Sequence, residues 1–236
     1  MPATLNIQNT LNWCRPLLKN QPLEVTNFEP AMTTANMILQ TMVGAPFRWP
    51  FNRGVFTLPL SVDTYDYTKI VADYGFMENV TITSNDTNET MPLAVEKSLP
   101  KPATMKSRPT AMAVQQNFGN TQLGIRLKER PEKSYTLEGI YQKSAMVLAS
   151  PGSYWFPVTD EFSMIFNWGF LTMISLLVDD MRFTTFEKFF IGRLLGTQDG
   201  LDAQTRNIFL GNWLELTRTI SRSGELVNNG SIGRRA

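Results

Sequence analysis

The sequence predicts an α+β protein, in which N- and C-terminal helices form a helical bundle and an antiparallel β-sandwich or barrel-like region is inserted between them. Apolar residues recur at helical spacing near both ends of the chain, alternate with a period of two in the middle, and are separated there by turn-forming residues. Helices and strands are thus segregated along the chain, as in α+β folds. We expect residues 1–48 and 157–222 to form the bundle, 49–156 the β domain, and 223–236 an extended C-terminal arm.

Two helices are expected before the β region. The first, within residues 4–18, has Thr4 as a candidate N-cap and apolar residues at steps of four, three and four: Ile7, Leu11, Cys14 and Leu18. Pro16 favours an end before it, because proline removes a backbone hydrogen bond inside a helix. The second helix ends at Gly44, a suitable C-cap, after a helical face made of Ala35, Ile38, Leu39, Met42 and Val43.

Alternating apolar residues predict strands between about residues 54 and 150. The clearest runs are Phe56, Leu58, Leu60; Phe76, Val80, Ile82; Leu123, Ile125, Leu127; and Tyr135, Leu137, Gly139, Tyr141. Turn signals at 85–88, 119–120 and 130–133 favour antiparallel hairpins. The proline-rich and basic stretch 97–110 predicts an extended loop.

Three helices are expected after the β region. The first starts at a cap on Thr159 or Asp160 and runs to the Asp179-Asp180 pair. The others carry the apolar sets Phe186, Phe189, Phe190, Leu194 and Ile208, Phe209, Trp213, Leu216, Ile220. Beyond Ser221 the chain has too few apolar residues to fold alone. It is either a disordered terminus or an arm ordered by docking on a partner, with these docking candidates: Leu226, Val227, Ile232, Arg234 and Arg235.

Composition restricts the chemistry that the chain can perform. It has no histidine, so Ser-His-Asp, Cys-His and histidine–metal sites are excluded, and its single cysteine can form no internal disulfide. We expect no enzyme activity, no metal and no cofactor, because phosphate-binding and metal-binding motifs are missing. The carboxylate pairs Asp160-Glu161 and Asp179-Asp180 are the remaining catalytic candidates, but acids at a helix N-terminus ordinarily complement the helix dipole.

Three other stretches are candidates for a functional role. Residues 162–178 are too short and too often interrupted by polar residues to favour a membrane span, so a buried helix is expected. The aromatic stretch 47–51 is either a stacking platform for single strands or, as we favour, a packed junction with Trp155-Phe156. The formal charge of +1 gives no general attraction to nucleic acid. A local basic loop could still contact DNA phosphates or another subunit, although a solvated loop is favoured: Lys97, Lys101, Lys106 and Arg108.

Several stretches together resemble the head-to-tail connector adaptors of tailed bacteriophages, which are tail tubular protein A-like virion proteins. They are Ala35–Gln40 with Pro46–Arg53, Tyr141–Lys143, Trp155–Phe162, Asp179–Phe183 and Asn207–Leu210. The resemblance implies a structural protein of the virion head–tail interface, synthesised in the host cytoplasm. It further implies a ring, typically of twelve subunits, that binds the portal protein on one side and tail or nozzle proteins on the other, around the DNA exit channel. In that family picture residues 223–236 would contact the portal.

Two other functions remained open from the residues themselves. One is a virion-associated cell-wall hydrolase that uses the carboxylates of Asp160 and Glu161. The other is a tail or receptor-binding structural protein, for which the β region would be the exposed tip.

Overall fold

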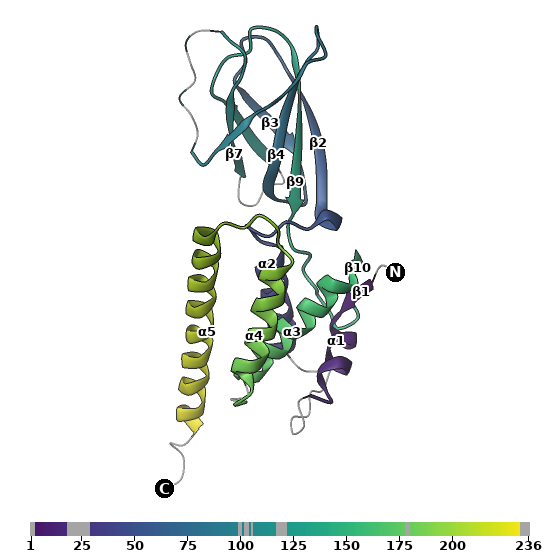
Figure 1. Cartoon of the computed structure of the whole chain (residues 1–236), viewed down its shortest axis with the longest axis vertical. Helices are drawn as coiled ribbons and strands as arrows, with labels where there is room; N and C mark the ends of the chain where they lie inside the picture. Colours follow the sequence, from purple (N-terminus) through teal and green to yellow (C-terminus); the bar gives the residue numbers. More distant parts are fainter. Residues whose placement is uncertain are drawn as a thin grey trace. The chain divides into compact units, whose positions relative to one another are not determined.

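The computed structural model describes residues 3–17, 29–98, 101, 104, 106–116, 122–177 and 180–231, with the backbone alone at 29–30, 116 and 221–231. The chain forms two compact units. The first combines Met1–Met42 with Ala145–Ala236 and holds the helices; the second is Val43–Ser144 and holds two of the sheets (Figure 1). The predicted α+β class, with strands inserted between N- and C-terminal helices that pack together, is confirmed.

The helical unit contains five described α-helices and a two-stranded antiparallel ribbon. In chain order its elements are β1 (Ala3–Asn6), α1 (Ile7–Cys14), α2 (Glu29–Val43), β10 (Tyr154–Val158), α3 (Asp160–Leu177), α4 (Phe183–Gly196) and α5 (Ala203–Ser231). The ribbon pairs β1 with β10. The candidate cap Thr4 lies in β1; the side chain of Asn6 caps α1 instead, accepting a hydrogen bond from the Asn9 N–H at 2.7 Å.

Helix α3 is the centre of this unit. Buried residues occur all around it: Phe162, Ile165, Phe166, Phe170, Met173 and Ile174. Thr159 caps it as predicted, because its Oγ1 accepts a hydrogen bond from the Phe162 N–H at 3.2 Å. At Gly169 an added Cβ would lie 2.7 Å from the Phe190 ring and 2.9 Å from Ile38. The missing side chain therefore lets α2 and α4 approach α3 closely.

Two polar contacts connect distant segments to this helical core. The Thr10 hydroxyl of α1 donates to Asn167 of α3 at 2.8 Å. The Asn36 amide of α2 exchanges two hydrogen bonds with the backbone of Leu148, at 2.9 and 3.0 Å. Because Leu148 is itself buried, these bonds hold the loop before β10 against the helices.

The second unit is a sandwich of two four-stranded sheets, neither of which closes into a barrel. One sheet has the order β2-β9-β4-β5 and the other β3-β8-β7-β6. Their bounds are β2 Arg53–Leu60, β3 Asp66–Ile70, β4 Tyr74–Ser84, β5 Thr90–Pro92, β6 Ala94–Glu96, β7 Ala111–Gln116, β8 Gln122–Leu127 and β9 Tyr135–Lys143, with the 3-10 turn η1 at Pro50–Asn52 before β2. All neighbours are antiparallel except β6 and β7, which are parallel.

The sandwich core is made of the inward residues of both sheets, including every apolar residue of the predicted runs except Phe76 and Gly139. Glycine and aromatic residues face each other between β2 and β9, where Gly54 pairs with Tyr141 and Phe56 with Gly139. A Cβ on Gly139 would lie 2.5 Å from the Phe56 ring. Each ring therefore covers the glycine opposite and fills the space where that residue has no side chain.

Three expectations differ from the observed arrangement. The turn at 130–133 joins β8 to β9, which lie in different sheets, so it carries the chain between layers and closes no hairpin. The inserted unit ends at Ser144, ahead of the expected boundary at residue 156, because β10 pairs with β1 in the helical unit. The expected extended arm starts inside a helix, since α5 continues to Ser231 with no proline to interrupt its hydrogen bonds.

Candidate functional site

The predicted docking residues fall in two places. Leu226 and Val227 lie within α5, in the part where only the helical backbone is described. Ile232, Arg234 and Arg235 lie outside the described residues. This segment is thus a helix as far as Ser231, where an extended arm was expected. The contact of the five docking residues with a partner stays a prediction.

Helix α5 presents more apolar surface than its own unit covers. In its described part, Phe209, Trp213 and Thr217 form a single buried stripe. This stripe meets α4, because Trp213 Nε1 donates to Glu187 at 2.7 Å and its ring lies 5.1 Å from that of Phe190. Beside the stripe, Leu210 and Leu214 are 38% and 47% exposed.

The exposed leucines belong to a regular row of side chains. Arg206, Leu210, Leu214 and Arg218 follow one another at steps of four and are all exposed. Residues four apart form a ridge along one side of a helix. We call this row the Arg-Leu ridge. The four-residue spacing of the leucines is a visible signal in the sequence. The ridge was not predicted from it, because the stronger stripe of Phe209 and Trp213 already explains the helix.

A second apolar surface lies on the loop before β10 and on β10 itself. Met146, Tyr154 and Phe156 are 42%, 61% and 51% exposed and line an open hollow of about 530 Å³. Ser150 and Ser153 close the turn below it through a hydrogen bond between their hydroxyl groups at 3.1 Å. Trp155 lies against Phe162 of α3 with ring centroids 5.6 Å apart. Its expected place at a junction with the β domain stays a prediction. We call this surface the β10 hollow.

The basic loop is partly neutralised by acids from elsewhere in the sandwich. Lys106 Nζ lies 3.2 Å from Asp63, which also pairs with Arg130 at 3.3 Å. These cations, Lys106 first, hold the pKa of Asp63 below its usual value. Arg108 is exposed and its guanidinium contacts the Met91 sulfur at 3.1 Å. Lys97 and Lys101 are also exposed. Because Lys106 is paired with Asp63, the four predicted residues do not form one unpaired basic patch.

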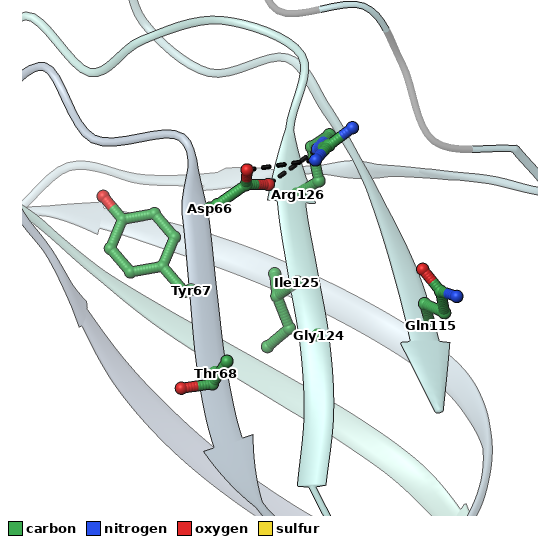
Figure 2. A pocket seen from close by; sticks show the side chains of 7 residues that line it. All are labelled: Asp66, Tyr67, Thr68, Gln115, Gly124, Ile125 and Arg126. Carbon is green, nitrogen blue, oxygen red and sulfur yellow. Dashed lines mark hydrogen bonds and ion pairs between the residues drawn. The ribbon is translucent and has the colours of Figure 1, made fainter. Parts of the chain in front are cut away.

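A smaller hollow lies on the outer face of the β3-β8-β7 layer (Figure 2). Its volume is about 180 Å³, and it lies over Gly124, where the absent side chain leaves space between Thr68 and Gln115 of the flanking strands. Figure 2 shows the carboxylate of Asp66 facing the guanidinium of Arg126 at one end, with hydrogen bonds of 2.6 and 3.0 Å. These two charges therefore satisfy each other at the rim.

The described members of the two predicted carboxylate pairs have structural roles. Asp160 and Glu161 are exposed in the first turn of α3, where acids stabilise the helix N-terminus. Asp180 pairs with Arg182 at 2.7 Å, and this hydrogen-bonded partner lowers the pKa of the carboxyl group. Asp179 lies outside the described residues.

A buried polar network is present at the start of β2, where the sequence predicted only an ordered aromatic turn. Gln142 is fully buried; its Oε1 accepts the Trp49 backbone N–H at 3.1 Å and its Nε2 donates to Glu78 at 2.8 Å. Arg53 completes the network with two hydrogen bonds to Glu78. The arginine is the main cause of the low pKa of Glu78. The network orders the turn before β2, which is an architectural role.

The remaining sequence predictions concern the cysteine, metal binding and a membrane span. Cys14 is buried, as expected, and burial raises its pKa to about 12, so it is a poor nucleophile. The described residues include no cluster of three metal-binding side chains. None of the helices that the structure describes offers an apolar run of membrane-spanning length.

Comparison with known proteins adds no assignment. The sequence matches no protein-family model, and the search of curated proteins finds no match. The candidate sites are therefore surfaces, defined by the geometry above: the Arg-Leu ridge, the β10 hollow, the basic loop and the C-terminal part of α5.

Proposed function

We propose that this chain is a structural adaptor of a tailed bacteriophage, which docks on the portal protein, forms a ring with copies of itself and joins head to tail around the DNA exit channel. The resemblance of its aromatic turns and helix starts to such adaptors motivates the proposal. The chemistry of the described surfaces agrees with it, because carboxylates there stabilise a helix terminus or an ion pair.

One observation carries the proposal: the exposed apolar side of α5. The helix spans 29 residues, yet its described part buries one narrow stripe and leaves the neighbouring side chains Leu210 and Leu214 38% and 47% exposed. Contiguous exposed apolar residues on a helix are typical of surfaces that meet another chain. A subunit of an assembly has such surfaces before it assembles.

The docking segment in this proposal is the end of α5 together with residues 232–236. Its apolar members are Leu226, Val227 and Ile232, and Arg234 and Arg235 add positive charge. An amphipathic helix can bind a partner by laying its apolar face in a groove. We therefore assign portal binding to this segment, with Leu226 and Val227 as its anchors.

DNA contact is a secondary part of the proposal. Among the four basic-loop residues, Lys97 and Lys101 are the better candidates, because the ammonium group of Lys106 already lies near Asp63. Their contacts with phosphates would be non-specific and would weaken with rising salt.

The test mixes the purified protein with the portal ring of its own phage and examines the product by sedimentation and electron microscopy. We expect a symmetric ring of this chain, of twelve copies, on one end of the portal. A monomer in the absence of portal would not contradict the proposal, because assembly can require the template. A portal that sediments unchanged at saturating protein would contradict it.

A matched pair of variants tests the docking segment. Leu226→Asp with Val227→Asp should abolish portal binding, because two charges would replace the apolar anchors. Asn228→Asp with Asn229→Asp adds the same charge to the same helix and should leave binding within about threefold of wild type, as expected for near-neutral positions.

A further inference from the structure

Two exposed apolar surfaces of different shape lie on the helical unit. The Arg-Leu ridge on α5 is convex and the β10 hollow is concave. Figure 1 shows α5 on one side of this unit and the β1–β10 ribbon on the other, with α3 and α4 between them. The two surfaces therefore lie on elements at opposite sides of the unit and do not cover each other within one chain.

The spacings of their apolar side chains match. Leu210 and Leu214 are four residues apart, about 6 Å along the helix at 1.5 Å per residue. Tyr154 and Phe156, which line the hollow, are two residues apart, about 7 Å along β10 at roughly 3.3 Å per residue. The hollow, at about 530 Å³, is large enough to receive two leucine side chains.

Their charges also match. Arginines stand at both ends of the leucine pair on the ridge. The first turn of α3 follows β10 directly and carries the exposed acids Asp160 and Glu161. A positively flanked apolar ridge and an apolar hollow beside two acids are complementary surfaces, and such complementarity selects one partner over others.

We infer that the Arg-Leu ridge of one copy of this chain seats in the β10 hollow of the next copy, with Leu210 and Leu214 against Tyr154 and Phe156, and with arginine opposite the acids of α3. The contact joins different surfaces of the two copies, so it is head to tail, and repetition of such a contact produces a ring when the rotation closes. This deepens the proposed function by naming the contact between ring subunits.

Closure of a ring strengthens the assembly beyond the affinity of a single pair of copies. Each subunit in a ring takes part in two such contacts, so the last one forms within an existing assembly at high effective concentration. A chain with a formal charge of +1 can still carry opposite charges locally, and these help to fix which surfaces meet.

A complementation experiment distinguishes this contact from any symmetric one. The ridge variant carries Leu210→Asp and Leu214→Asp; the hollow variant carries Tyr154→Asp and Phe156→Asp. Each should be a monomer by analytical ultracentrifugation under conditions where wild type assembles. Mixed in equal amounts, they should form a one-to-one dimer and nothing larger, because each pair retains one intact ridge and one intact hollow. The dimer also shows that both variants are folded.

Gln204→Asp with Asn212→Asp is the matched control, because it adds the same charge to exposed positions of α5 away from the ridge. It should assemble like wild type. A second pair keeps the apolar residues: Arg206→Glu with Arg218→Glu should weaken self-association at least about tenfold, and Asp160→Lys with Glu161→Lys in the other copy should restore it.

Three results would overturn the inference: a wild type that remains monomeric at the highest soluble concentration, a ridge or hollow variant that assembles like wild type, or a mixture that yields no dimer. None of them decides the proposed function, which the portal experiment tests separately. Normal portal binding with an intact ring in both variants would leave the adaptor function standing and remove this contact. Normal self-association of wild type without portal binding would leave this contact standing and remove the adaptor function.

Discussion

Replacing Gln142 by leucine should destabilise the β unit strongly, although the two side chains have similar volumes. The Gln142 side chain is fully buried and makes two hydrogen bonds, one with the Trp49 backbone and one with the carboxylate of Glu78. Leaving a buried N–H without an acceptor costs about 1–3 kcal/mol, and a lost hydrogen bond to a charged group about 1.5–3 kcal/mol. We expect the free energy of unfolding to fall by about 3–5 kcal/mol.

Hydrogen exchange of the backbone amides in β4 and β9 measures this loss within the β unit itself. Amides that exchange only through unfolding of the unit should exchange faster by a factor of at least about 100, since 1.4 kcal/mol corresponds to a factor of ten. Gln115→Leu is the control, because it makes the same chemical change at an exposed position of β7 and should shift stability by at most about 0.5 kcal/mol. A change below about 1 kcal/mol for Gln142→Leu would refute the reasoning about buried polar groups.

Further predictions concern packing, pH and thiol reactivity. Gly169→Ala should destabilise the helical unit by about 1–3 kcal/mol, because the new methyl group would meet the Phe190 ring and Ile38, whereas Gly192→Ala, with no neighbour within 4 Å, should be neutral or stabilising in thermal melts. The folded-state pKa of Glu78 is lower than its ordinary value of 4.5, chiefly through Arg53, so its stabilisation is complete above that value and is lost as the pH falls through the folded pKa. Urea titrations between pH 7 and pH 3 should therefore show a smaller loss for Glu78→Gln than for wild type; parallel curves would contradict this. The Cys14 thiol should react with a thiol reagent at pH 8 only at the rate at which the helical unit opens, and reaction as fast as a free cysteine would contradict its burial and its pKa of about 12.

Local pattern was sufficient to predict the class of the fold and its main elements. The helical stripe around Phe162 and Phe166, the cap at Thr159 and the alternating runs in β2, β8 and β9 all depend on neighbours close in sequence. These elements are long or strongly periodic, so the period of burial is visible in the residues themselves.

Short strands and the boundary between the units were not visible in the same way. β1 and β10 have only four and five residues, and most of the chain separates them in sequence. They form strands because each supplies backbone hydrogen-bond partners for the other. The Asn36–Leu148 contact and the space left by Gly169 likewise depend on segments that only the folded chain brings together.

The features of the candidate surfaces also separate into those set by local sequence and those set by tertiary structure. The amino-acid sequence by itself determined the α+β class, the absence of histidine chemistry and the apolar stripe of the last helix, because each is a property of composition or of local spacing. The tertiary structure alone decided that Lys106 is paired with Asp63, that the chain is helical to Ser231, and that Leu210, Leu214, Tyr154 and Phe156 remain exposed. The physical reason is that exposure is set by which other elements cover a residue, and those elements are distant in sequence.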